Sequence, residues 1–167
     1  MIRKISEVVY KISGIFIVIT LGLIVFFVFA QVISRYVFHF SIAWAQELTT
    51  YLMIWMIFIG CSMGLRQGEI ASLSFFVDKL TEKIAVWFIC TVDLMLIIFF
   101  TICIISNREI IKFAMKQSSP VLNIPMGWIS LSLTVSFALM IFYSLIHIDD
   151  NLKKTYFINR QEKGDKL

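Results

Sequence analysis

The feature that most constrains this chain is the stretch Ile12–Ser34, which contains no charged side chain. An α-helix rises about 1.5 Å per residue and the hydrocarbon core of a bilayer is about 30 Å thick, so roughly 20 apolar residues can cross it. Four segments of the sequence meet this requirement, namely 12–33, 48–65, 84–106 and 126–147. We therefore predict an all-α integral membrane protein with four spanning helices.

The composition argues against a water-soluble protein. Of the 167 residues, 59% are hydrophobic, and the mean hydropathy is +0.88. Too little polar surface is left to coat a soluble domain. We expect one membrane domain over residues 1–167, with a charged tail at 148–167. No nucleophile–base pair or metal-ligand spacing is present, so we expect neither an enzyme nor a cofactor.

The first apolar stretch also resembles a cleaved secretory signal, because Arg3 and Lys4 precede it and Val28-Phe29-Ala30 could be a cleavage site. The apolar core of such a signal has about 7–15 residues. This stretch is longer and continues through Gln31-Val32-Ile33. We interpret it as a retained first helix.

The positions of Lys and Arg predict the orientation, since loops on the cytoplasmic side retain positive charge. Eleven of the 15 basic residues lie in the N-terminal segment, the second loop and the tail. The remaining four lie in the first and third loops, as Arg35, Arg108, Lys112 and Lys116. We expect both termini in the cytoplasm and both of these loops outside.

Asp93 is the one ionisable residue well inside a predicted span. A carboxylate there is costly unless it is neutralised, hydrogen-bonded or hydrated. It could act in a proton or cation relay, or as a polar clasp to Thr91, Ser62 or a partner subunit. We favour the clasp, because a relay generally needs several such groups.

Histidine and cysteine give no sign of a cofactor. His39 in the first loop and His147 at the inner end of the fourth span should lie about 30 Å apart. They cannot ligate one haem iron, although a haem shared with another subunit stays an alternative. The three cysteines form no CxxC pair, so we interpret them as packing residues.

Small residues mark helix-packing faces. Gly60 and Gly64 form a GxxxG step, which lets another helix approach closely. Hydroxyl side chains in the fourth span could bond to their own helix or across an interface; these are Ser130, Ser132, Thr134 and Ser136. Packing within the chain and packing against a partner both fit these patterns.

The helix ends carry typical membrane-interface signals. Aromatic residues gather near the outer surface, among them Trp44 and Trp128, where such rings anchor at headgroup level. Glu47 suits the positive end of the second helix, and Pro125 suits the first turn of the fourth. The segment 70–83 mixes apolar and charged residues, which predicts a short amphipathic helix lying in the interface.

Several of these motifs together resemble a known family, the small membrane subunit (DctQ-like) of tripartite ATP-independent periplasmic (TRAP) transporters. The resemblance rests on Arg35-Tyr36-Val37-Phe38, Trp44-Ala45-Gln46-Glu47-Leu48, Phe58-Ile59-Gly60, Leu65-Arg66-Gln67-Gly68-Glu69 and Ser119–Trp128. Many members have a His-Ile pair and an Asp after the second span, where this chain has Ile70, Ala71 and Ser74. Many also carry a tyrosine and a proline in the last helix, where this chain has Ser130 and Thr134. These differences suggest a divergent branch.

The resemblance implies a multi-pass protein of the bacterial inner membrane that works with two partners. A large permease subunit would move substrate with sodium, and a periplasmic binding protein would deliver an organic acid, either sialic acid or a C4-dicarboxylate. The small subunit would brace the permease and help to dock the binding protein. We expect the partner contacts to involve Arg35, His39, Trp44, Glu47, Gly60, Gly64, Asp93, Lys112, Lys116 and Trp128.

Two other classes of protein remain as alternatives. A self-sufficient small exporter would act as a dimer and couple transport to protons through Asp93. A membrane anchor of a redox enzyme would carry haem. The family resemblance favours the transporter subunit over both.

Overall fold

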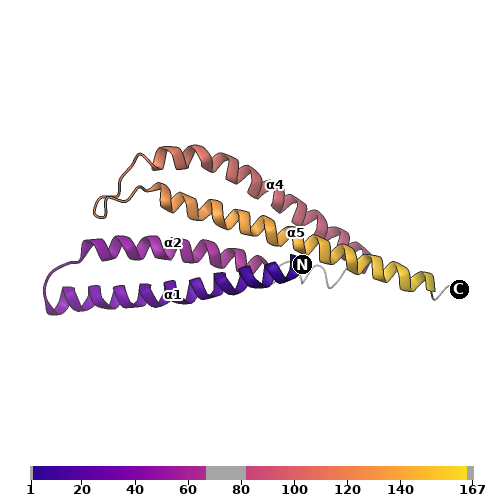
Figure 1. Cartoon of the computed structure of the whole chain (residues 1–167), viewed down its shortest axis with the longest axis horizontal. Helices are drawn as coiled ribbons and strands as arrows, with labels where there is room; N and C mark the ends of the chain where they lie inside the picture. The colour runs from indigo at the N-terminus through magenta and orange to yellow at the C-terminus, as the bar shows by residue number, and fades with distance from the viewer. Residues whose placement is uncertain (1, 67–81, 165–167) are drawn as a thin grey trace.

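The computed structural model describes residues 2–66 and 82–164. In these ranges it has four helices, α1 (Ile2–Val37), α2 (Ala43–Arg66), α4 (Glu82–Ala114) and α5 (Gly127–Gly164) (Figure 1). Each contains a stretch long and apolar enough to cross a membrane. The prediction of an all-α protein with four spanning helices is confirmed.

The helices are longer than the predicted spans. The first three extend beyond the predicted limits at both ends, and α5 continues to Gly164, through most of the segment predicted as a tail. Hydropathy marks only the part of a helix that lies in hydrocarbon, so polar turns beyond it escape notice. The predicted amphipathic helix at 70–83 lies mainly outside the described residues, and its last two residues belong to α4.

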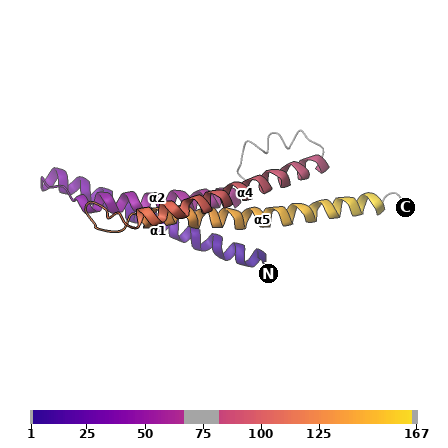
Figure 2. The same cartoon turned by 90° about the horizontal axis from the view of Figure 1, so that it is seen from above.

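The four helices form a row in the order α1, α2, α5, α4. Helix α2 packs on α1 and α5, and α5 packs on α2 and α4, while α1 touches α5 only slightly. Figure 1 shows the row from its broad side, and in Figure 2 the helices overlap near the short connections and spread apart toward the termini. The described helices are therefore an open layer with α1 and α4 at its edges, and they enclose no channel.

The row has two distinct ends. The short connections α1–α2 and α4–α5 lie at one end, which we call the loop end, and both termini point toward the other, the termini end (Figure 1). The loop end is the one that the sequence predicts to face outward. The chain thus forms two antiparallel hairpins, α1–α2 and α4–α5, which meet through α2 and α5.

Small polar side chains fill much of the interior, while large apolar ones cover the outside. In α1 the buried polar residues are spaced by seven or fourteen positions, at Ser6, Ser13, Thr20 and Ser34. A spacing of seven keeps one face of a helix toward its neighbours, and α1 packs mainly on α2. Small residues allow this close packing, because lipid provides no hydrophobic drive for helices to associate.

Hydrogen bonds link each pair of neighbouring helices. Gln31 of α1 donates to Thr49 of α2 at 3.5 Å, and the Ser136 hydroxyl of α5 donates to the Phe58 carbonyl of α2. The Asn107 amide of α4 donates to the Ser130 carbonyl at 2.8 Å and to the Thr134 hydroxyl at 2.9 Å.

The hydroxyl groups of α5 therefore serve both uses that the sequence left open. Ser136 and Thr134 bond across interfaces, whereas the Ser132 hydroxyl donates to the Ile129 carbonyl of its own helix.

Candidate functional site

The connection between α4 and α5 is a closed turn. The backbone N–H of Met126 donates to the Gln117 carbonyl and that of Ser119 to the Ile124 carbonyl, both at 2.9 Å. Asn123 has a positive φ of 53°, a conformation that asparagine tolerates better than most residues. Pro125 lies just before α5, where its carbonyl accepts the N–H of Trp128. The turn therefore has a defined shape.

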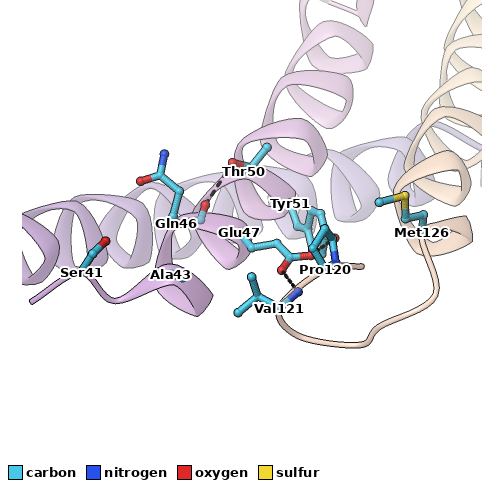
Figure 3. Close-up of a pocket in the computed structure, with 9 residues that line it drawn as sticks. All are labelled: Ser41, Ala43, Gln46, Glu47, Thr50, Tyr51, Pro120, Val121 and Met126. Atoms are coloured by element: carbon cyan, nitrogen blue, oxygen red, sulfur yellow. Dashed lines mark hydrogen bonds between the residues drawn. The ribbon is translucent and has the colours of Figure 1, made fainter. Parts of the chain in front are cut away.

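Glu47 fastens this turn to α2. Its Oε2 accepts the backbone N–H groups of Val121 and Leu122, each at 3.1 Å, and its Oε1 accepts the Tyr51 hydroxyl. Figure 3 shows the carboxylate between Tyr51 and the turn. Hydrogen bonds to an ionised acceptor are stronger than neutral ones. We call Glu47, Tyr51 and the turn 117–126 the loop-end clasp, because they join the two hairpins.

The sequence identified Glu47 but missed its partners. The sequence placed Glu47 at the start of the helix, where the helix dipole alone explains a glutamate. In the structure α2 begins earlier, at Ala43, so Glu47 lies in its second turn, and nothing local points to amides more than 70 residues away. An ion pair with Arg35, which the sequence also allowed, is not among those of the described residues. Both carboxylate oxygens are instead occupied by donors from α2 and the turn.

A shallow pocket of about 550 Å³ adjoins the clasp. It lies between the first turns of α2 and the α4–α5 connection (Figure 3). Its lining is Ser41, Ala43, Gln46, Glu47, Thr50, Tyr51, Pro120, Val121 and Met126. The pocket combines a carboxylate with hydroxyl, amide and apolar groups at the loop end.

The other loop-end residues from the sequence prediction are exposed. His39 adopts a positive φ of 57° just after α1, where the N–H of Phe40 returns to the Ser34 carbonyl at 3.3 Å. This is the usual left-handed helix stop, so His39 shapes the first connection. Trp44 packs edge-on against Phe27, and Lys112 pairs with Glu109 at 2.8 Å. Arg35, Lys116 and Trp128 are also exposed.

At the termini end, Asp93 of α4 pairs with His147 of α5. The Asp93 residue is only 4% exposed, and its Oδ2 lies 2.8 Å from Nδ1 of His147. The two hydroxyls considered from the sequence bond to their own helices instead, Thr91 to the Trp87 carbonyl and Ser62 to the Ile59 carbonyl. A buried carboxylate thus joins α4 to α5.

The spacing of Asp93 and His147 along the sequence could have predicted this pair. Asp93 lies 21 residues before the end of α4 at Ala114, and His147 lies 20 residues after the start of α5 at Gly127. In an antiparallel hairpin, positions equally far from the connection lie at the same level. The sequence analysis considered His147 only as a haem ligand and so overlooked its partner.

Arg66 forms a second contact at this end. The Cζ atom of its guanidinium lies 4.2 Å from the ring centroid of Tyr10 on α1 and 5.8 Å from that of Tyr143 on α5. A guanidinium over an aromatic face is attracted by the negative charge density of the ring. We call Tyr10, Arg66, Asp93, Tyr143 and His147 the termini-end cluster, to which all four helices contribute.

The GxxxG step is not used for close helix packing within the described chain. A Cβ atom added at Gly60 would meet only the end of the Ile17 side chain at 3.9 Å, and one added at Gly64 would meet nothing within 4 Å. Space therefore remains beside Gly64 for another molecule.

These features define a class of protein. An open layer of apolar helices, joined by polar contacts at both ends, resembles a subunit of a membrane assembly. Residues 24–153 match the family model for the DctQ component of tripartite ATP-independent periplasmic transporters. The chain belongs to this family, and it is a small permease subunit of a multi-pass transporter in the bacterial inner membrane. Members of this family are permease components and not enzymes.

Curated relatives agree with this assignment. A Haemophilus influenzae protein described as a TRAP transporter small permease protein is 25% identical over 97% of this chain and 99% of its own length. The Vibrio cholerae sialic acid TRAP transporter small permease protein SiaQ is 23% identical over 74% of this chain and 71% of its own. The C4-dicarboxylate small permease protein DctQ of the same organism is 31% identical over 38% of this chain and 28% of its own.

Proposed function

We propose that this subunit braces a large permease subunit and helps to dock a periplasmic substrate-binding protein during sodium-coupled uptake of an organic acid. The observation that carries the proposal is the open row. Within the most apolar stretches of α1, α2 and α4, only 11% of the residues are buried. A layer with such broad apolar faces is suited to lie against the helices of a larger membrane protein.

The shape of the chain favours a structural role in the transporter over a role in moving the substrate. Transporters commonly bind ions and carboxylates between broken helices near the middle of the membrane. In the described residues each of the four helices is continuous. Fastened at both ends, the row would give a moving part of the permease a fixed surface to slide against.

The loop end supports docking of a binding protein. Exposed basic side chains gather there, namely Arg35, Arg108, Lys112 and Lys116. Glu109 offsets one of them through its ion pair with Lys112, and Glu47 is engaged in the clasp. The surface is therefore basic overall, and it suits an acidic face on the binding protein.

The substrate is expected to be sialic acid or a C4-dicarboxylate. Relatives named for each substrate resemble this chain, and both substrates are organic acids. The choice between them belongs to the binding protein and the permease, because the small subunit offers no group for the cargo in this proposal.

Reconstitution tests the division of labour. Proteoliposomes would contain the chain alone, the large permease alone, or both, with the binding protein outside and an inward sodium gradient. We expect uptake of labelled substrate only when all three proteins are present. Transport by the chain alone, with loss on Asp93→Asn substitution, would instead establish the proton-coupled dimeric exporter.

A charge reversal tests docking separately. Lys112→Glu with Lys116→Glu should raise the binding-protein concentration needed for half-maximal uptake by about tenfold, which corresponds to about 1.4 kcal/mol. The matched control is Lys153→Glu, because Lys153 is an exposed cation on α5 beyond the termini-end cluster. Unchanged uptake and unchanged assembly in the double variant would remove docking from the proposal.

A further inference from the structure

The pocket beside the loop-end clasp combines apolar groups with a single carboxylate. Its apolar groups come from both sides, from Ala43 at the start of α2 and from Pro120 and Val121 in the turn. Its polar groups include the Glu47 carboxylate and the Gln46 amide. Figure 3 shows this carboxylate directed from α2 toward the turn. Such a lining matches a side chain with an apolar stem and a cationic head, which is a lysine or an arginine.

The hydrogen bonds of the clasp leave the charge of Glu47 available. Its three donors are the Tyr51 hydroxyl and the backbone N–H groups of Val121 and Leu122, and all three are neutral. An ionised carboxylate has about four acceptor positions, so a further donor can bind. A cationic donor would add the counter-charge that the neutral groups do not supply.

The level of the pocket in the membrane indicates which protein can reach it. The pocket residues of α2 lie in the first turns of a helix whose candidate span is Ala43–Arg66. A side chain that enters the pocket therefore comes from a protein at the same level of the membrane. In the proposed function that protein is the large permease subunit, whereas the binding protein docks on the loop end from outside.

The charges around the pocket favour the same partner. The exposed loop end is basic and suits an acidic binding protein, because of Arg35, Arg108, Lys112 and Lys116. An acidic surface is repelled by the Glu47 carboxylate, since like charges that meet at an interface are unfavourable. The pocket and the outer surface thus suit partners of opposite charge.

We propose that this pocket receives a lysine or arginine side chain of the large permease subunit. The cationic head lies on the Glu47 carboxylate, and the apolar stem lies against Pro120 and Val121. This assignment rests on the proposed function, because it requires the two subunits to associate. It gives Glu47 two roles, since the carboxylate that holds the turn also holds the partner.

Opposite charges introduced at Gln46 test the charge of the occupant. Gln46 is exposed and lines the pocket next to Glu47, while other groups form the clasp. The measurement is the dissociation constant between the purified full chain and the purified large permease in detergent. We expect Gln46→Lys to weaken binding by about tenfold and Gln46→Glu to strengthen it by about threefold. Added salt should reduce both effects.

The matched control makes the same two substitutions at Gln117. This residue is exposed at the same end of the row and does not line the pocket. Each variant should change the dissociation constant by less than about twofold. Equal responses at Gln46 and Gln117 would reveal general charge attraction and overturn the site. Unchanged affinity in both Gln46 variants would also overturn it, while the proposed function would stand.

Photo-crosslinking identifies the occupant directly. A photoreactive phenylalanine analogue replaces Ala43, which is exposed at the pocket, in a mixture of all three proteins. We expect an adduct with the large permease next to a lysine or an arginine, identified by mass spectrometry. An adduct with the binding protein or with a second copy of this chain would overturn the assignment. If the chain and the permease formed no complex at all, the proposed function and this site would both be wrong.

Discussion

At the loop end a carboxylate of α2 binds backbone amides of a distant turn, whereas at the termini end side chains of neighbouring helices bind one another. The difference follows from the local surroundings. A turn exposes backbone N–H groups that need acceptors, and one partly exposed carboxylate supplies them. Between continuous helices the backbone N–H groups are already paired, so each link needs a side-chain donor or acceptor.

The two ends also differ in how much stability the protein should lose when one bonding partner is removed. Glu47 is partly exposed, and water can replace a lost partner. Asp93 is buried within the apolar part of α4, and a carboxylate left alone there has no substitute partner. We therefore expect substitutions at the termini end to be more damaging than those at the loop end.

The largest effect should come from His147→Leu, which leaves the Asp93 carboxylate buried without its partner. We expect a loss of about 3 kcal/mol in the free energy of unfolding, measured by SDS-induced unfolding in mixed micelles. The control is the double variant Asp93→Leu with His147→Leu, which removes both members of the pair and should recover most of the loss. Wild-type stability in the single variant would refute the asymmetry between the ends.

The next effect should come from Glu47→Ala, which removes the acceptor for two amides and the Tyr51 hydroxyl. We expect a loss of stability smaller than that of His147→Leu, because water can solvate the freed groups, together with faster hydrogen exchange at the amides of Val121 and Leu122. Thr50→Ala is the matched control, since its hydroxyl donates only to the Gln46 carbonyl of its own helix. If exchange at both amides stayed slow, the clasp would not hold the turn.

A smaller effect is expected from Asn107→Leu, between the two ends of the α4–α5 hairpin. Hydrogen bonds between membrane helices contribute about 0.6 kcal/mol on average, and Asn107 makes two of them. The same unfolding assay should therefore give a loss of about 1 kcal/mol. A loss as large as that of His147→Leu would show that the effect on stability does not depend on where along the hairpin the contact lies.

The smallest effect on the isolated chain is expected from Gly64→Ala, because the added methyl group meets no atom within 4 Å. Stability should stay within about 0.5 kcal/mol of the wild type. If Gly64 contacts the permease, Gly64→Ile should reduce co-purification of the two subunits while the isolated chain stays folded. Normal co-purification of that variant would place the permease contact elsewhere.

Several features could be predicted from the sequence because they depend on residues close together along the chain. The apolar run from Ile12 to Ser34 requires a spanning helix whatever its neighbours are, and the same holds for the other three spans. The motifs around Arg35, Glu47 and Arg66 identified the family, which the family model confirms. The expected contact residues for the permease and the binding protein stay predictions.

The sequence by itself determined four membrane helices and the family of the chain, because hydropathy and short motifs act locally. Only the tertiary structure decided that these helices lie in the order α1, α2, α5, α4, that Glu47 binds the turn at Val121 and Leu122, and that Asp93 faces His147. Helices that are apolar on all sides carry no stripe to mark which face meets which neighbour. Their partners are chosen by the fit of side chains that lie far apart in the sequence.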